Sequence, residues 1–382
     1  MSNQIPFNKP FIAGKEMFYM AQAILGGHSA GDGPFTMKCQ RFIQEMLHTP
    51  KVFLTQSYAS ALDMAAMLCE VVPGDEVIMP SFAYVSAANS FYMRGATPVF
   101  VDIRPDTLNI DESKIEQAVT GRTRAIVTPH YAGIGCKIEI IMDIARRHGI
   151  LVVEDAASGF GSQYEGKHLG TIGDLGVISF HETNNIICGE GGAILINNER
   201  FIEKAEIIRE KGTNRSKFFR GEVDKYTWVD IGSSFLPSDL VAAFLYGQLE
   251  EADIITQKRN EIFRYYSEQF TQLCESGLIR IPVCPSECRH SANLFYLLID
   301  TAPGDRDRLI INLKKKEINA VFHYVPLHTS PMGLSMGYKY GDLPVTEDLC
   351  GRLVRLPCYY DLTREDQDRV IDYVYKFFGK GR

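Results

Sequence analysis

The sequence predicts an α/β protein with a large domain, built on a mostly parallel mixed sheet between helices, and a smaller C-terminal α/β domain. Two patterns predict it. Short apolar runs alternate with amphipathic stretches through the first two thirds, and several runs are apolar throughout, as in strands covered on both faces. A shorter set of similar patterns follows a long helical stretch. The 382 residues leave room for two domains, which we place at 1–250 and 251–382.

The individual elements follow from these patterns. Strands are expected at 76–79, 98–102, 125–128, 150–154, 176–180 and 193–197, with helices between them at 60–71, 85–94, 112–120 and 138–148. One long helix is expected from about 238 to 273, with Ser238 capping its start and Gly277 following its end. Strands at 278–283, 294–299 and 320–324 and helices at 306–316 and 364–378 would form the smaller domain.

Composition excludes several classes of protein. Forty Lys and Arg against 47 Asp and Glu leave a net charge of −7, which argues against nucleic-acid binding. No run approaches the roughly 18 apolar residues of a membrane span, so we expect a cytoplasmic protein without membrane contact. Nine cysteines, an odd number, favour free thiols. Cys284 and Cys288 lack a second pair of ligands nearby, so no metal site is predicted.

Two glycine-rich segments resemble phosphate-binding motifs, but each lacks a residue that its motif requires. Residues 161–167 have the spacing of a P-loop as far as Lys167, but His168 stands where Ser or Thr is required. Residues 133–138 begin like a dinucleotide fingerprint and end with Ile138 in place of the third glycine. Neither a P-loop nucleotide site nor a dehydrogenase is therefore expected.

The segment 152–157 is more informative, because an apolar strand ends there in Glu154 and Asp155. The carboxyl ends of strands are the edge at which open α/β sheets bind ligands, and a carboxylate buried there needs a positive partner. The alternative is that Asp155 only caps a following helix.

Four further segments favour a ligand site at this edge. Small polar residues at 54–62 begin a helix, where free backbone N–H groups favour a phosphate. Aromatic residues at 79–86 follow another strand and could stack on a flat ring. A polar segment at 179–185 follows a strand, and a glycine-rich turn at 188–192 leads into the next.

In this order and spacing the segments resemble the sugar-nucleotide aminotransferases of the fold-type I pyridoxal-phosphate class, over essentially the whole chain. The run at 209–228 most resembles the branch of that family that converts dTDP-4-keto-6-deoxyglucose to dTDP-4-amino-4,6-dideoxygalactose, in deoxyaminosugar synthesis for O-antigen or enterobacterial common antigen. The resemblance implies transfer of an amino group from L-glutamate, through pyridoxamine phosphate, to C4 of a dTDP-4-keto-6-deoxyhexose. It also implies a homodimer with shared active sites.

The resemblance assigns roles to several residues. Asp155 would pair with the pyridine nitrogen and keep the ring protonated, so that the ring withdraws electrons. Tyr84 would stack on the ring. Ser179 and the backbone around Tyr58 and Ala59 would hold the phosphate.

Three cofactor-binding positions depart from the commoner family pattern. Ala59 stands where a Thr hydroxyl is usual, Ser158 where Gln or His approaches the ring hydroxyl, and Ser234 where Asn reaches the phosphate in the neighbouring subunit. Each change removes or shortens one polar contact, worth about 1 kcal/mol. Cofactor binding should survive.

The fourth departure concerns the chemistry. The family reads Ser-Phe-His-Glu-Thr-Lys-Asn, and this chain has Asn184 at the position of the Schiff-base lysine. A carboxamide neither condenses with an aldehyde nor takes up a proton near neutral pH. Pyridoxal or pyridoxamine phosphate should therefore bind non-covalently, and the chain should be impaired or should trap its product as the external aldimine.

Several interpretations of Asn184 stay open. The chain is either an altered form of an ordinary aminotransferase or a natural lysine-free relative. A lysine-free dehydratase-like enzyme that uses pyridoxamine phosphate, and a non-catalytic cofactor-binding subunit, are the competing functions.

For the substrate, the diphosphate of a sugar nucleotide requires a basic cluster in this acidic chain. Arg209, Lys211, Arg215 and Arg220 supply one within 209–220, unless that run is only a solvated charged surface. The segment 323–328 resembles one that lines the sugar pocket, so His328 is a further expected contact.

Overall fold

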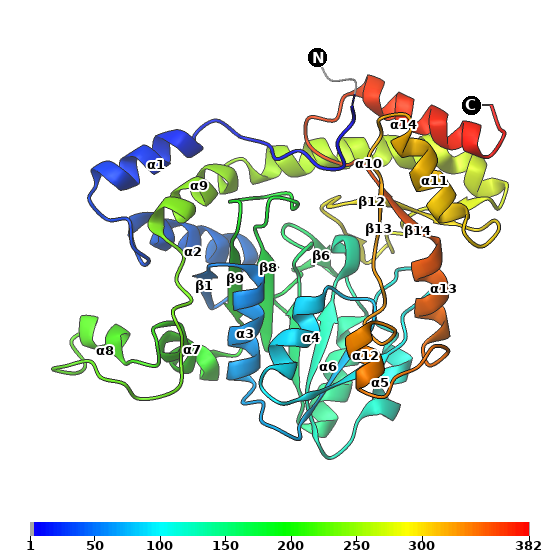
Figure 1. The fold of residues 1–382 in the computed structure, drawn as a ribbon. Coiled ribbons are helices and arrows are strands. Elements are labelled where there is room, and N and C mark those ends of the chain that lie inside the picture. The colour runs from blue at the N-terminus through cyan, green and yellow to red at the C-terminus, as the bar shows by residue number, and fades with distance from the viewer. Residues whose placement is uncertain (1–3, 382) are drawn as a thin grey trace.

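The computed structural model describes residues 4–381, and its large domain is a seven-stranded sheet covered by helices on both faces (Figure 1). The strand order is β1-β9-β8-β5-β4-β2-β3. The strands are β1 (Lys51–Thr55), β2 (Glu76–Pro80), β3 (Thr97–Val101), β4 (Thr123–Pro129), β5 (Leu151–Asp155), β8 (Leu175–Ser179) and β9 (Gly192–Ile196).

Strand β9 runs against both of its neighbours, and the other pairs in the sheet are parallel. The sheet is therefore mixed and mostly parallel, as the sequence predicts. The register brings Thr55 and Ser179, at the ends of β1 and β8, beside Gly192 at the start of β9. Asp155 ends β5 at the same edge, opposite Pro129 of β4.

Successive residues of the central strands face two different hydrophobic cores, since side chains alternate across a sheet. Val152 belongs to the core beneath α2, α6 and α9, and Val153 belongs to the core beneath α3, α4 and α7. The first face is covered by α2 (Pro34–Leu47), α6 (Ile138–His148) and α9 (Asp239–Leu249), and the second by α3 (Tyr58–Leu68), α4 (Val85–Tyr92) and α7 (Ile202–Arg209).

The small domain has a four-stranded antiparallel sheet in the order β10-β12-β14-β13. Its strands are β10 (Ile279–Arg280), β12 (Phe295–Ile299), β13 (Val321–Phe322) and β14 (Leu353–Leu356), and its helices are α10 (Ala252–Glu275), α11 (Asp305–Lys314) and α14 (Arg364–Phe377). Ile5 joins this core through a bridge to Ile318. Helix α10 contributes Ile255 to a core of the large domain and Phe270 to the core of the small domain, so it connects the two domains.

The remaining elements are short or lie at the edges. They are α1 (Glu16–Leu25), α5 (Glu112–Ala118), α8 (Arg215–Phe219), α12 (Pro331–Ser335), α13 (Pro344–Arg352), and a small sheet of β6 (Gln163–Tyr164), β7 (Lys167–His168) and β11 (Cys288–Arg289). The P-loop-like segment is thus a β6–β7 hairpin, in agreement with its rejection as a nucleotide site. Between residues 4 and 381, no helix is long and apolar enough to cross a membrane.

The single long helix predicted from 238 to 273 is wrong, because the chain breaks it between Leu249 and Ala252. The break lets α9 pack against α1 and α2 while α10 packs against α14 in the small domain (Figure 1). The predicted cap at Ser238 is confirmed, since its side chain accepts a hydrogen bond from the N–H of Val241.

Candidate active site

A cavity of about 700 Å³ lies at the carboxyl edge of the large sheet, between the two domains. Seven of the predicted site residues line it: Tyr58, Ala59, Tyr84, Asp155, Ser158, Ser179 and Asn184. The small domain contributes Asn293, Leu294, His323, Tyr324 and Arg355 to the opposite wall.

The two acids at the end of β5 have different surroundings. Glu154 is fully buried and accepts hydrogen bonds from the backbone N–H groups of Gly170, Ile172 and Gly173 at 3.0, 2.6 and 2.6 Å. It also bonds the ring of His130 at 2.9 Å. Glu154 therefore holds the following loop in place, which leaves Asp155 as the acid that faces the cavity.

Asp155 is only 5% exposed and has neutral hydrogen-bond donors. The hydroxyl of Tyr58 donates to its Oδ2 at 2.5 Å, and the N–H of Ala157 donates to Oδ1 at 3.1 Å. Burial raises the pKa of Asp155, and these two bonds act against that rise. Residues 156–162 form turns, so Asp155 caps no helix there. A protonated ring nitrogen would give this carboxylate a positively charged hydrogen-bond donor, which neither Tyr58 nor Ala157 supplies.

The start of α3 offers a site for a phosphate. The side chain of Ser57 accepts from the N–H of Ser60 at 3.1 Å, while the N–H groups of Tyr58 and Ala59 belong to the first turn, whose donors have no acceptor within a helix. Gly192 of β9 packs directly against this turn, and a Cβ there would lie 2.7 Å from the nitrogen of Tyr58. The donors and the adjoining Ser179 hydroxyl suit the phosphate of a pyridoxal cofactor.

Asn184 lies in the turn that follows β8, with its carboxamide held at both ends. Its Nδ2 donates to the Oγ of Ser179 at 2.8 Å, and its Oδ1 accepts from the Nδ2 of Asn293 at 3.2 Å. Among the cavity-lining residues that the structure describes, none is a lysine. Lys204 lies on α7, where it pairs with Glu70 at 2.6 Å.

Tyr84 and Ser158 also lie on the cavity wall. Tyr84 precedes α4 and is 54% exposed, with its ring centroid 6.5 Å from that of Tyr58. Its face is available to a planar group in the cavity. Ser158 is held by its carbonyl, which accepts from the hydroxyl of Ser291 at 3.4 Å.

Five predicted residues do not reach this chain's own cavity. Arg209, Lys211, Arg215, Arg220 and Ser234 all lie at the end of α7 or in the segment between α7 and α9, and none of them lines the cavity. On the backbone, Ser234 bridges to Glu210.

Three of the four basic side chains predicted to contact the substrate are engaged in ion pairs. Arg209 pairs with Asp32, and Arg215 pairs with Glu210 at 3.2 Å. Arg220 pairs with Glu206 at 2.9 Å. Within one chain, these three arginines are thus paired with acidic residues away from the cavity.

The structure gives no support to His328 as a substrate contact. Its ring is fully buried, and both ring nitrogens are bonded, Nδ1 to the Ser81 hydroxyl at 2.7 Å and Nε2 to Glu347 at 3.0 Å. As placed, His328 ties α13 to the end of β2. His323 and Tyr324, earlier in the same segment, line the cavity instead.

Sequence reasoning missed Arg355 and Tyr131. Arg355 lies on β14, and its Nη1 donates to the Nε2 of His323 at 2.9 Å. The Nδ1 of His323 lies 3.2 Å from the hydroxyl of Tyr131. Burial and the nearby Arg355 lower the pKa of His323 to about 2, so the imidazole is neutral. Nothing in the local sequence marks Arg355, which only the fold brings to the cavity.

Comparison with known structures defines the class of this site. The chain superposes on Spr1654 of Streptococcus pneumoniae, described as a sugar aminotransferase, with a TM-score of 0.91 and 26% identity over 98% of this chain and 97% of the other. That protein has been solved in pyridoxal-phosphate and pyridoxamine-phosphate forms. The fold is that of a sugar aminotransferase scaffold that uses pyridoxal or pyridoxamine phosphate.

Sequence comparison places the chain more narrowly. The family model described as the DegT/DnrJ/EryC1/StrS aminotransferase family matches residues 12–375, and the chain belongs to that family. It is 35% identical to an uncharacterised protein of Methanocaldococcus jannaschii, covering 92% of each chain. It is 31% identical to the spore coat polysaccharide biosynthesis protein SpsC of Bacillus subtilis, covering 97% of this chain and 96% of the other.

Proposed function

We propose that this chain binds pyridoxal or pyridoxamine phosphate non-covalently, and that its scaffold serves transfer of an amino group from L-glutamate to C4 of a dTDP-4-keto-6-deoxyhexose. The observation that carries the proposal is the position of Asn184, fixed between Ser179 and Asn293 beside the candidate phosphate site. We infer that this asparagine replaces the lysine of the family, so that transfer is impaired.

Each part of the cavity has a task in this proposal. The bound cofactor would supply an electron sink for the carbon that exchanges its amino group. Asp155 would hold the ring nitrogen protonated, the first turn of α3 with Ser179 would hold the phosphate, and Tyr84 would cover one face of the ring. The small-domain wall would exclude water from the opposite side.

Asn184 cannot move a proton in this site. Its carboxamide nitrogen already donates to Ser179, and an amide has no basic lone pair near neutral pH. Loss of a positioned general base costs about 10² to 10⁴-fold in rate. The covalent anchor of the cofactor would be lost with it.

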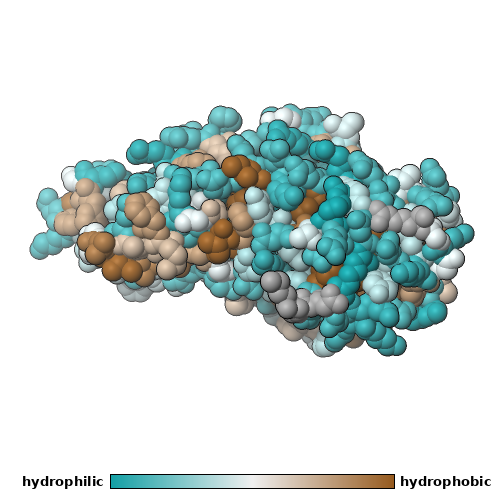
Figure 2. Space-filling model, turned by 90° about the horizontal axis from the view of Figure 1, so that it is seen from above, coloured by the Kyte–Doolittle hydropathy of each residue, from teal (hydrophilic) through white to brown (hydrophobic). Residues whose placement is uncertain are grey.

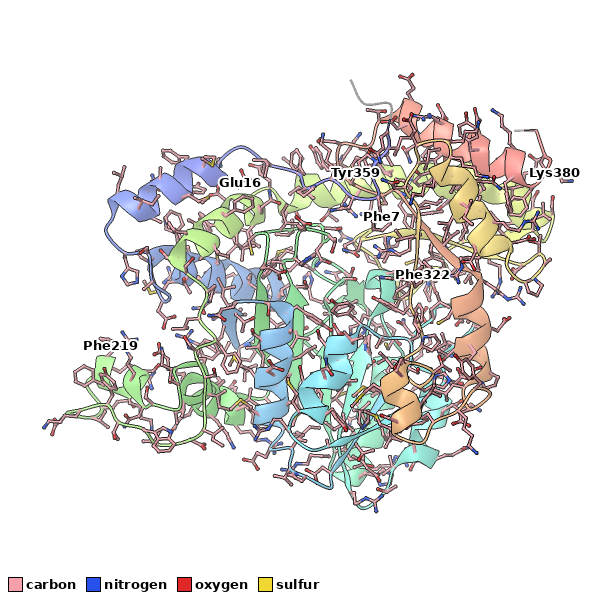
Figure 3. The ribbon with its side chains drawn as sticks, in the orientation of Figure 1. Phe7, Glu16, Phe219, Phe322, Tyr359 and Lys380 are labelled. Atoms are coloured by element: carbon pink, nitrogen blue, oxygen red, sulfur yellow. The ribbon has the colours of Figure 1, made fainter. Side chains whose placement is uncertain are left out.

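We also propose that the protein is a homodimer whose subunits complete each other's sites. The segment 212–232 projects from the large domain, and Figures 1 and 3 show α8 and Phe219 at its far end. Phe219, Tyr226 and Trp228 of this segment are 69%, 53% and 78% exposed. A partner's cavity would receive the basic run and Ser234, neither of which reaches its own.

Helix α1 supports the same assembly. Its Met17, Phe18, Ile24 and Leu25 are 73%, 59%, 61% and 88% exposed, and Figure 2 shows apolar side chains gathered on that end of the molecule. An apolar surface of this kind marks an interaction site. A second copy of the chain is the proposed occupant.

The direct test is an amino-transfer assay with L-glutamate and dTDP-4-keto-6-deoxyglucose. We expect a rate for the wild-type chain at least about 10²-fold below that of Asn184→Lys, because lysine restores both the anchor and the base. Asn185→Lys, one position further along, is the matched control and should stay inactive. An Asn184→Lys variant that binds the cofactor but makes no amino sugar would contradict the proposed substrate or reaction. A deoxygenated sugar produced by the wild-type chain would instead identify it as a lysine-free dehydratase.

A further inference from the structure

We propose that Arg355 and the hydroxyl of Tyr131 form an oxyanion-binding subsite in the cavity, which takes a carboxylate or phosphate group of the substrate. This inference rests on the proposed function, because it names the part of that site that recognises substrate charge. It concerns a wall of the cavity separate from Asp155 and the start of α3.

The charges that line the cavity favour an anion beside Arg355. Arg355 is the only lysine or arginine among the described residues that line it, whereas Asp155 and Glu190 are both acidic. An amino-acid donor and a sugar nucleotide both bring negative charge into this space. On this chain, Arg355 is the side chain with a permanent positive charge to meet it.

Arg355 also lacks a counter-charge. No carboxylate within residues 4–381 lies within 4.0 Å of its guanidinium nitrogens, and its Nε is buried without an acceptor. Phe7 packs against the guanidinium, whose central carbon lies 4.8 Å from the ring centroid. A partly buried guanidinium with unfilled donors is suited to bind a carboxylate or a phosphate.

The two hydrogen bonds of the His323 ring have a defined direction. A guanidinium can only donate, so the Nε2 of His323 accepts from Arg355. The proton of the neutral ring is therefore on Nδ1, which donates to the hydroxyl oxygen of Tyr131 at 3.2 Å. The proton of Tyr131 is left free to donate to another acceptor.

Both donors are held on rigid parts of the fold. Arg355 lies on β14, which pairs with β12 on one side and β13 on the other. Tyr131 follows β4 of the large domain, is 7% exposed, and packs edge-on against Phe82 with ring centroids 4.7 Å apart. His323 links these two donors across the domain boundary.

Two sources of oxyanion fit this subsite, namely the carboxylate of the amino donor and the diphosphate of the sugar nucleotide. Calorimetric titration of the pyridoxamine-phosphate-loaded protein with glutarate and, separately, with thymidine diphosphate distinguishes them. For Arg355→Gln we expect the dissociation constant of at least one probe to rise about tenfold or more, because a charge-assisted bond is lost. The probe that loses affinity identifies the source, and loss with both means that the subsite takes either anion.

Two further variants keep the test independent of folding. Tyr131→Phe should lower the affinity for the same probe several-fold. The affinity of Arg355→Lys should lie between those of the wild type and Arg355→Gln, because lysine keeps the charge but lacks the paired N–H donors of the guanidinium. Arg352→Gln is the matched control: Arg352 lies three residues away, outside the cavity, and pairs with Asp348 at 2.7 Å.

The inference is overturned if both probes bind Arg355→Gln as tightly as they bind the wild type. If Arg355→Gln does not fold, the same result with Arg355→Lys and Tyr131→Phe overturns it. Equal losses in Arg352→Gln, or a wild-type protein that binds neither probe, would also overturn it. Failure of the proposed function is a different result, since pyridoxamine phosphate would then not bind to the wild-type chain at all.

Discussion

Replacement of Tyr58 by phenylalanine tests how the cavity controls the charge of Asp155. The change removes one hydroxyl, which donates to Oδ2 of Asp155 at 2.5 Å in buried surroundings. Asp155 would keep only the N–H of Ala157 as a donor at 3.1 Å. The side chain otherwise keeps its shape, so the effect of the substitution is confined to this bond.

The magnitude follows from the type of bond. A hydrogen bond to a charged group contributes about 1.5 to 3 kcal/mol. This bond stabilises the charged carboxylate more than the protonated acid, so its loss should raise the pKa of Asp155 further. Asp155 is 5% exposed, so water can replace little of the lost interaction.

The sign of the pH dependence follows from the raised pKa. Between the usual carboxyl pKa of 3.8 and the raised value, native Asp155 keeps a proton that the unfolded chain has lost, so stability falls as pH rises through this window. In Tyr58→Phe the window extends further upward. The variant should therefore lose most relative to the wild type near neutral pH and least near about pH 4.

Denaturant unfolding of the cofactor-free protein across about pH 4 to 8 measures this difference, and infrared spectroscopy of the carboxyl band reports the protonation of Asp155 directly. Tyr84→Phe is the control, since the Tyr84 hydroxyl makes no bond to Asp155. A loss of stability in Tyr58→Phe that does not change with pH, or no loss at any pH, would refute the reasoning.

Two other substitutions give sharp outcomes. Gly192→Ala would place a Cβ 2.7 Å from backbone atoms of Ser57, so we expect destabilisation of about 1 to 3 kcal/mol and weaker cofactor binding in a spectroscopic titration. Gly121→Ala, where no atom lies within 4 Å of the added carbon, is its control, and equal effects would contradict the packing argument. Leu25→Glu on the exposed face of α1 should yield monomers in sedimentation experiments; an unchanged mass would remove α1 from the proposed interface.

The sequence predicts the large sheet well, because its central strands are buried on both faces and read as continuous apolar runs. Strand β1 was missed because only three apolar residues separate Lys51 from Thr55, too few to stand out. Strand β14 was missed because Arg355 interrupts its apolar residues. The break between α9 and α10 is set by packing against different partners, which periodicity does not report.

The residues of the site likewise include some that the sequence predicts and some that it does not. Asp155, Tyr84 and Ser179 end strands or begin helices, and strand order alone brings such positions to one edge. Arg355 belongs to the other domain, and its place in the cavity depends on how the two domains pack. The basic run at 209–220 has a conspicuous composition, but the sequence could not show that its arginines are paired outside the cavity of the same chain.

The central claim is that this cavity holds pyridoxal phosphate without a covalent bond to the chain, because Asn184 stands at the reactive position. Borohydride reduction of the loaded protein, followed by mass spectrometry of its peptides, tests this claim most directly. We expect the wild-type chain to bind the cofactor but carry no covalent label, and Asn184→Lys to be labelled at residue 184. A label on any lysine of the wild-type chain, or no label in Asn184→Lys when the cofactor is bound, would contradict the account.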